Sequence, residues 1–398
     1  MYIQARRESF YIALLLQSVL LFFIIGEISL SPSEAKILHS EESIIKYIFG
    51  FLFQFIERSD YSLRIPFLLL HIINSILFFD IAKKFFKKEQ DAFFASILFL
   101  LLPGINSAAI LVSKAGIIIF ATLIFLYLFL KNKEIPYSVL MIMALLDSAF
   151  SILFLSLVIY GAFKKDGKLL FFSILLFSFS MYFYGFDSSG KPKSHFLDTL
   201  GIYLAIFSPL LFLYFFYSIY RTLIKEEKNI IWFVVATSLF LSITLSFRQR
   251  IAIEDFAPFL VLGTILLTKT FFDGYRVRLP EFRGRYKIIS LVVILFLCLN
   301  ASLLFVNKFF YNFLENPKKH FAYNFHYSKD LAESLKELGV DFVTSQNSAL
   351  VKQLNFYNIR SGDLYRIEEF KFDDSAQEVS ILYNQIEIST FYVSKVNI

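Results

Sequence analysis

Ionisable side chains of complementary chemistry stand near the ends of several apolar segments of this sequence. Glu34 follows the first apolar run, and Lys114 and His195 lie between later runs. Arg248 and Arg250 stand between two further runs. A carboxylate can act as a general base, and arginine or lysine can stabilise a phosphate leaving group. The sequence contains no Gly-rich phosphate loop, no His/Glu zinc spacing and no Gly-x-Ser-x-Gly elbow, so the chemistry of soluble enzymes is not indicated.

The composition is that of a polytopic membrane protein. Of 398 residues, 57% are hydrophobic and 18% are charged, and the mean hydropathy is +0.62. A soluble domain has about 45–50% apolar and about 25% charged residues. The single cysteine, Cys298, excludes an intramolecular disulfide. The net charge is +6, and the excess of basic residues lies in the apolar part of the chain. We therefore interpret these residues as belonging to cytoplasmic loops rather than to a nucleic-acid-binding surface.

Apolar runs long enough for membrane spans follow one another through most of the chain. They cover residues 10–30, 66–82, 92–112, 115–130, 136–163, 169–186, 199–220, 229–247, 256–272 and 288–306. We interpret the run 136–163 as two short helices that break near Asp147 and Ser148. This break places 19 basic residues in the cytoplasmic stretches and nine in the outer loops before the tail. The sequence therefore predicts eleven spans with the N-terminus inside and the C-terminus outside.

Two segments are predicted on the outer face. The first outer loop, residues 31–65, contains apolar residues at helical spacing between Ile44 and Ile56, which predicts an interfacial helix. The tail, residues 307–398, is less apolar. It predicts helices over 328–338, ended by Gly339, and around 348–354, with strands over 340–344, 381–383 and 391–396. The expected fold is thus an all-α transmembrane domain over residues 1–306 and a small α/β extracytoplasmic domain.

The order of several short motifs resembles a known family. They are Ser33-Glu34-Ala35, Ser62-Leu63-Arg64-Ile65-Pro66, Leu102-Pro103-Gly104, Gly190-Lys191-Pro192 to His195, Ser208-Pro209-Leu210, Ser246 to Arg250, Asp255-Phe256-Ala257-Pro258 and Leu354-Asn355-Phe356-Tyr357. In this order they are similar to motifs of the GT-C membrane glycosyltransferases that use polyprenyl-phosphate sugars. This group includes the protein O-mannosyltransferases and lipid A aminoarabinose transferase. The likeness extends from Ser33 to Tyr392.

The resemblance implies a function and a set of site residues. The implied protein is a multi-pass glycosyltransferase of the inner (plasma) membrane. It would transfer a sugar from a polyprenyl-phosphate donor to a lipid, glycan or protein acceptor of the cell envelope on the outer face. Glu34 would be the catalytic base. The candidate substrate- and phosphate-binding residues are Arg248, Arg250, Lys114, His195 and Arg64. No metal or cofactor is expected, because the phosphate itself departs.

Each of these residues also has a plain structural interpretation. Glu34 could be a helix-start charge after Ser31 and Pro32, Arg248 and Arg250 could contact lipid headgroups, and His195 could simply be exposed. Arg64 could anchor the first loop on Glu57 or Asp60.

The sequence also departs from the family pattern. Ser33 stands where the family has the first acid of its acidic pair, and Asp147 where it often has a lysine. The segment Lys114-Ala115-Gly116 stands where the family usually has a Thr-Asp pair. A catalytically degenerate polyprenyl-phosphate-binding protein therefore remains an alternative. A transporter is a second alternative, but it would carry ionisable residues at mid-membrane depth rather than at the outer ends of spans.

Overall fold

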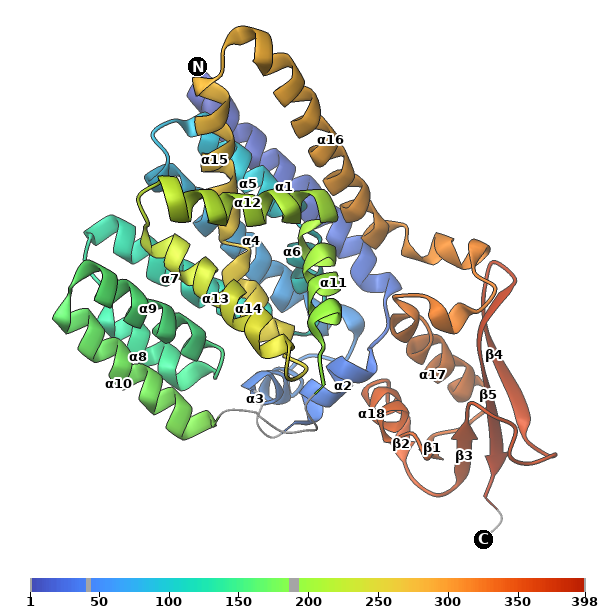
Figure 1. Cartoon of the computed structure of the whole chain (residues 1–398). Coiled ribbons are helices and arrows are strands. Elements are labelled where there is room, and N and C mark those ends of the chain that lie inside the picture. Colours follow the sequence, from blue (N-terminus) through green and yellow to red (C-terminus); the bar gives the residue numbers. More distant parts are fainter. Residues whose placement is uncertain (1, 41–43, 186–192, 397–398) are drawn as a thin grey trace. The chain divides into compact units, whose positions relative to one another are not determined.

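The computed structural model describes residues 2–40, 44–185 and 193–396, with side chains from residue 6 and from residue 45 in the first two ranges (Figure 1). The chain divides into two compact units. The helical unit comprises residues 1–19, 67–109 and 114–302. The loop–tail unit comprises residues 20–66, 110–113 and 303–398. The last long helix ends at Phe305, and the predicted domain boundary at residue 306 stays a prediction. The compact unit that contains the tail, however, also includes the first outer loop.

The apolar runs form helices, as predicted. In chain order these are α1 (Tyr2–Glu27), α4 (Asp60–Phe85), α5 (Glu89–Leu101), α6 (Pro103–Ile110), α7 (Ala115–Asn132), α8 (Tyr137–Leu146), α9 (Phe150–Lys164), α10 (Gly167–Tyr184), α11 (Phe196–Phe207), α12 (Pro209–Lys225), α13 (Ile230–Ser246), α14 (Ile253–Leu260), α15 (Gly263–Val277) and α16 (Pro280–Phe305). Among the described residues, six helices are long and apolar enough to span a membrane, or up to eight if each of two bent pairs is one span. The shorter apolar helices α8, α9 and α13 account for the remaining predicted runs, and their crossing stays a prediction.

Helix breaks follow local chemistry. The predicted break near Asp147 is confirmed, because α8 ends at Leu146 and the Asp147 carboxylate accepts the Ala149 N–H at 2.8 Å just before α9. Two runs predicted as single spans are helix pairs, α5–α6 bent by 59° and α11–α12 bent by 102°. In each pair a proline, Pro103 or Pro209, begins the second helix. Proline cannot donate the ladder hydrogen bond and disfavours helical backbone at the preceding residue.

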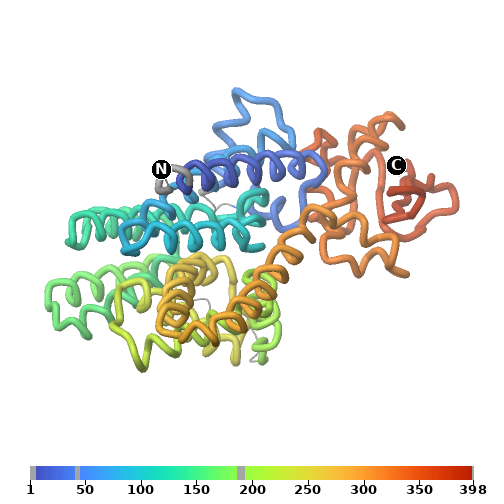
Figure 2. The backbone as a smooth tube through the Cα atoms, turned by 90° about the horizontal axis from the view of Figure 1, so that it is seen from above, coloured from blue at the N-terminus to red at the C-terminus, as the bar shows by residue number. Residues whose placement is uncertain are grey.

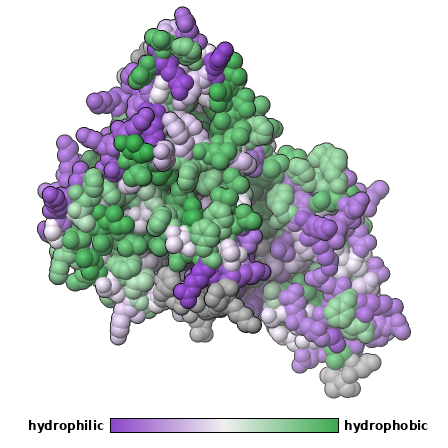
Figure 3. Space-filling view, viewed as in Figure 1, coloured by the Kyte–Doolittle hydropathy of each residue, from purple (hydrophilic) through white to green (hydrophobic). Residues whose placement is uncertain are grey.

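The helical unit buries aromatic and aliphatic side chains in one continuous core. Phe150, Phe154, Phe215 and Phe259 are among its fully buried members. Figure 2 shows α8, α9 and α10 running side by side. The surface of α16 is apolar as well as the core, because Ile288, Leu291 and Leu295 are exposed on this helix (Figure 3). An apolar outer surface around an apolar core is the pattern of a membrane-embedded protein.

The loop–tail unit contains a mixed sheet. Its strands β1 (Phe342–Thr344), β2 (Arg360–Ser361), β3 (Tyr365–Glu368), β4 (Gln377–Tyr383) and β5 (Ile386–Lys395) lie in the order β2-β1-β3-β5-β4. The strand β1 pairs in parallel with β2 and β3, whereas β5 pairs antiparallel with β3 and β4. The predicted tail helices are confirmed as α17 (Ser328–Glu337) and α18 (Ser348–Phe356). Gly339 has φ +71°, which explains the stop after α17. The sequence analysis missed β2 and β3, which are short.

The first outer loop contributes two short helices to the same unit, α2 (Pro32–His39) and α3 (Ile44–Leu52). In α3, Ile45 and Phe49 are buried, whereas Tyr47, Ile48 and Phe51 are exposed. The predicted helix is confirmed, and its place in the membrane interface stays a prediction.

A buried histidine makes the tail sensitive to acid. His326 is 3% exposed and its Nδ1 lies 2.9 Å from the hydroxyl of Tyr311. Burial, assisted by Lys308 and His320, lowers the pKa of His326 to about 3. The unfolded chain binds a proton near pH 6.5, so stability is fully present above that pH and is lost as pH falls from 6.5 toward 3. The slope is at most about 1.4 kcal/mol per pH unit for one histidine.

We therefore expect the melting temperature of the purified protein to fall between pH 7.5 and pH 5, and His326→Asn to reduce this fall. The measurement is thermal unfolding followed by tyrosine fluorescence. Substitution of the exposed His39 by Asn is the matched control and should leave the pH dependence unchanged. Equal pH dependence in wild type and His326→Asn would contradict this assignment.

Candidate functional site

Glu34 is held at the start of α2 by a capping box. Ser31 is the N-cap residue, and its hydroxyl accepts the Glu34 N–H at 3.3 Å. In return, the Glu34 Oε2 atom accepts the Ser31 N–H at 2.9 Å and its hydroxyl at 3.0 Å. Pro32 at the first helical turn favours the same start. The helix-start interpretation of Glu34 is thus confirmed by geometry, and the residue is 2% exposed.

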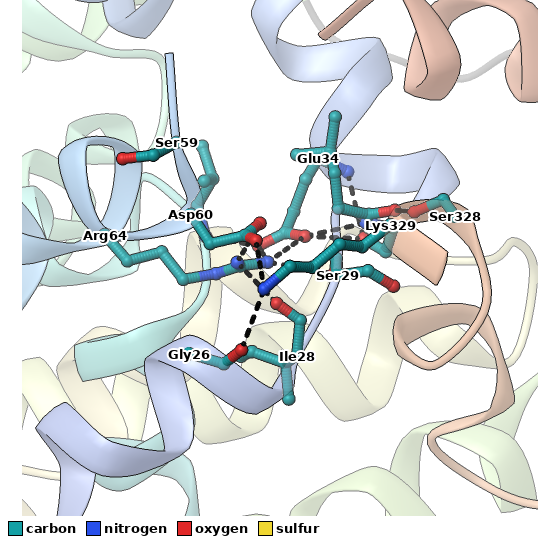
Figure 4. Close-up of polar contacts among 12 residues, drawn as sticks. Gly26, Ile28, Ser29, Glu34, Ser59, Asp60, Arg64, Ser328 and Lys329 are labelled. Carbon is teal, nitrogen blue, oxygen red and sulfur yellow. Dashed lines mark hydrogen bonds and ion pairs between the residues drawn. The ribbon is translucent and has the colours of Figure 1, made fainter. Parts of the chain in front are cut away.

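The guanidinium of Arg64 is the buried partner of Glu34. Arg64 is 0% exposed, and its Nη2 lies 3.0 Å from Glu34 Oε2. Its Nη1 lies 3.2 Å from Asp60 Oδ1, one helical turn away in α4. The same two nitrogens also donate to the carbonyls of Ile28 and Ser29, each at 3.0 Å (Figure 4). These contacts are those of an anchor for the first loop on Asp60. They leave the guanidinium enclosed, which speaks against the phosphate-binding role suggested by the resemblance.

Asp60 joins this ion-pair network to the tail. The Tyr357 hydroxyl donates to Asp60 Oδ1 at 2.7 Å and accepts the Leu30 N–H at 2.8 Å. Lys329 Nζ lies 3.6 Å from Asp60 Oδ2 and donates to the Gly26 carbonyl at 3.3 Å. Burial, followed by the charge of Asp60, raises the pKa of Tyr357. Sequence reasoning singled out Leu354 to Tyr357 by resemblance, but it missed that Tyr357 and Lys329 bind Asp60.

The carbonyl of Leu30 is a second point where the tail binds the first loop. It accepts hydrogen bonds from Ser328 Oγ at 2.7 Å and from Gln353 Nε2 at 2.6 Å. Both donors come from tail helices, Ser328 from α17 and Gln353 from α18, and both side chains are buried. Glu34 itself accepts one more bond, from the Val112 N–H to its Oε1 at 2.9 Å. The candidate base therefore has donors on both of its oxygens.

In the helical unit, Lys114 lies between two carboxylates. Its Nζ is 3.0 Å from Asp147 Oδ1 and 2.6 Å from Asp255 Oδ1, and about a quarter of each side chain is exposed. Burial alone would lower the pKa of Lys114, but Asp255 and Asp147 outweigh it and raise the pKa. The ammonium is thus charged and already paired. As a phosphate ligand, Lys114 would have to exchange one of these carboxylates.

The loop that contains His195 is joined to the loop that contains Arg248. The N–H groups of Lys193 and His195 donate to the carbonyls of Arg248 and Ser246 at 3.0 and 2.8 Å. The rings of Phe196 and Phe247 stack beside them, 4.8 Å apart between centroids. The structure therefore brings together two segments that the sequence analysis had selected separately. Gly190, Lys191 and Pro192 lie outside the described residues.

The side chains of His195, Arg248 and Arg250 differ in whether they already have a charged partner. His195 Nδ1 lies 3.1 Å from Asp198 Oδ2. Arg248 and Arg250 are exposed, and in the described ranges neither forms an ion pair. Of the predicted cations, these two are therefore best placed to accept an added anion. The expected arrangement of Glu34 opposite Arg248 and Arg250 stays a prediction. As for a metal, no group of three or more His, Cys, Asp or Glu among the described residues could hold one.

The fold is that of a GT-C-like polytopic membrane protein with a small α/β tail. The structure is similar to the crystal structure of ArnT from Cupriavidus metallidurans in the apo state, with a TM-score of 0.57. The match covers 99% of this chain and 98% of that one, at 9% sequence identity. This likeness shows the fold. No protein-family model matches the sequence, and no curated protein matches it.

We expect Arg64→Ala to destabilise the loop–tail unit strongly, because it leaves the buried Glu34 without its cation and Asp60 with the more distant Lys329 alone. Removing one partner of a buried ion pair costs about 3–5 kcal/mol. The measurement is thermal unfolding in detergent, with limited proteolysis of residues 31–65. Lys371→Ala is the control, because Lys371 and Asp374 form an exposed pair in the same unit, worth about 0–1 kcal/mol. Similar losses in the two variants would refute the anchor role.

Proposed function

We propose that this protein is an integral membrane glycosyltransferase that uses a polyprenyl-phosphate sugar as donor. The acceptor would be a lipid, a glycan or a protein of the cell envelope, on the outer face of the inner (plasma) membrane. The N-terminus would be cytoplasmic and the tail extracytoplasmic. The observation that carries the proposal is the likeness to ArnT, which extends over nearly the whole of both chains and includes the tail.

The proposed reaction needs cations at the departing phosphate. An acceptor hydroxyl attacks the anomeric carbon, the bond from that carbon to the phosphate oxygen breaks, and the phosphate leaves with the electron pair. Arg248 and Arg250 would stabilise the charge that develops on this oxygen. Their exposed guanidinium groups support this role. Lys114 and His195 would assist from the same unit, and Arg64 would position Glu34.

The proton of the acceptor hydroxyl needs a base, for which Glu34 is our candidate. Its ion pair with Arg64 supports an ionised carboxylate. To accept the proton, one Glu34 oxygen must exchange a present donor, such as the Val112 N–H, for the hydroxyl. If the carboxylate keeps its present donors, it cannot accept the proton. This favours a second candidate function, in which the protein binds polyprenyl phosphate without transferring the sugar. Ser33 at the first acidic position of the family supports the same alternative.

The test for the base is transfer from a radiolabelled polyprenyl-phosphate sugar by purified wild type and Glu34→Gln. If Glu34 is the base, transfer falls roughly 100-fold or more, since general base catalysis contributes about 10²–10⁴. Donor binding should change less than about twofold. Ser31→Ala is the matched control, because it removes the cap hydroxyl and leaves the carboxylate in place. It should cost about 1 kcal/mol of stability and retain transfer. Normal turnover in Glu34→Gln would exclude Glu34 as the base.

The test for the phosphate site is donor affinity in Arg248→Ala/Arg250→Ala. Loss of two charged contacts should weaken donor binding roughly 10-fold or more. The control is Lys131→Ala, which removes an exposed lysine outside the candidate site. Binding by wild type without any turnover would establish the second candidate function. A wild type that binds no polyprenyl phosphate would overturn both functions.

A further inference from the structure

A cavity of about 470 Å³ lies within the helical unit, and none of the candidate site residues lines it. Its walls come from α5, α12, α15 and α16, and they include Phe94, Leu98, Phe271 and Ile294. A volume of this size is typical of small-molecule sites, which span about 300–1,000 Å³. Within α16, which is described throughout, just two residues are buried, Leu297 and Ala301. The cavity therefore lies where this helix is loosely packed against its neighbours.

One end of the cavity is polar and aromatic. The hydroxyls of Tyr214 and Tyr286 lie 2.9 Å apart in its wall, and Lys287 lines it. Thr268 also lines the cavity and is 1% exposed, yet among the described residues its hydroxyl has no hydrogen-bond partner. A buried hydroxyl without a partner is costly. An acceptor such as an ester carbonyl in the cavity would satisfy it.

Three cations lie against Tyr275 and Tyr286, two aromatic residues of the cavity wall. Arg278 lies 4.0 Å from the ring centroid of Tyr286, and Arg283 and Lys287 lie 5.6 and 5.9 Å from that of Tyr275. We call these three residues the cation collar. The chain segments that carry the collar also hold the carboxylates Asp273 and Glu281. No ion pair joins either of them to the collar in the described structure.

The neighbouring carboxylate Asp91 pairs instead with Arg276. The collar residues are thus held by aromatic rings, and Arg278 and Arg283 also donate to backbone carbonyls. No acidic side chain of the described ranges forms an ion pair with the collar residues. An anion at this end of the cavity would be stabilised electrostatically.

We propose that this cavity binds one anionic glycerophospholipid, with an acyl chain between α16 and the α5–α12–α15 wall and its phosphate at the cation collar. Apolar walls beside an unneutralised cationic end are complementary to such a lipid, and basic pockets between transmembrane helices bind anionic headgroups. In the predicted orientation the lipid comes from the cytoplasmic leaflet. The bound chain packs α16 onto the rest of the unit. This proposal does not depend on the proposed transfer reaction.

The experiment is native mass spectrometry of the whole protein in nanodiscs of phosphatidylglycerol or phosphatidylcholine. One phosphatidylglycerol should remain bound per protein, and phosphatidylcholine should not. Lys287→Ala and Arg278→Ala should each weaken retention about fivefold, as expected for about 1 kcal/mol per cation. Arg285→Ala is the matched control from the same stretch, without a collar contact, and should change retention less than about twofold.

A second pair of variants tests the acyl-chain part of the cavity. Ile294→Trp fills it and should abolish retention, whereas Leu295→Trp, on the exposed side of α16, should not. Equal retention of the two lipids, or equal losses in Lys287→Ala and Arg285→Ala, would overturn the proposal. So would preferential binding of polyprenyl phosphate in the cavity, or a dimer of this chain that Ile294→Trp disrupts.

Discussion

Arg64 is a buried charge that joins the first outer loop to the beginning of α4. An ion taken out of water loses several kcal/mol of solvation, so a buried guanidinium persists only where carboxylates and carbonyls surround it. Glu34, Asp60 and two backbone carbonyls do this for Arg64. These groups come from the end of α1, the start of α2 and the start of α4. The geometry of the first outer loop thus depends on this residue.

The same network extends to the tail through Asp60, which also binds Tyr357 and Lys329. Independently of Asp60, the carbonyl of Leu30 accepts hydrogen bonds from Ser328 and Gln353. Because the tail helices donate these bonds, the tail and the first outer loop share one polar interior. This explains why the compact unit of the tail includes residues far away in sequence. In this network both Nη atoms of Arg64 and both Glu34 oxygens have partners, whereas the buried Arg64 Nε and Ser29 Oγ have none among the described residues.

The charges of the chain fall into two physical classes. Within the described part of the chain, Arg64 and Lys114 are paired with carboxylates, whereas Arg248, Arg250 and the cation collar form no ion pair. Paired cations hold elements of the fold in place, and their charge is already compensated. Unpaired cations at the edge of an apolar unit are open to anions from outside the protein. The two proposals, a donor phosphate at Arg248 and Arg250 and a phospholipid at Lys287, rest on this second class.

Local sequence determined much of the architecture. Apolar runs became helices because a backbone in lipid must satisfy its own hydrogen bonds, and the breaks at Asp147, Pro103 and Pro209 follow from capping and from missing donors. The capping box of Ser31 and Glu34 is equally local. The short strands β2 and β3 were missed because two and four residues carry too little periodicity to be recognised.

The tertiary structure alone decided the partners of the candidate site residues. Residue types suggested that Glu34 is a base and Arg64 an anchor or ligand. Their shared ion pair, and the role of Tyr357 at Asp60, depend on segments about 30 and 300 residues apart meeting in space. Likewise, Lys114 could not be recognised as paired until Asp147 and Asp255 were placed beside it. A single sequence records which charges exist, whereas the packing of helices decides which of them neutralise one another.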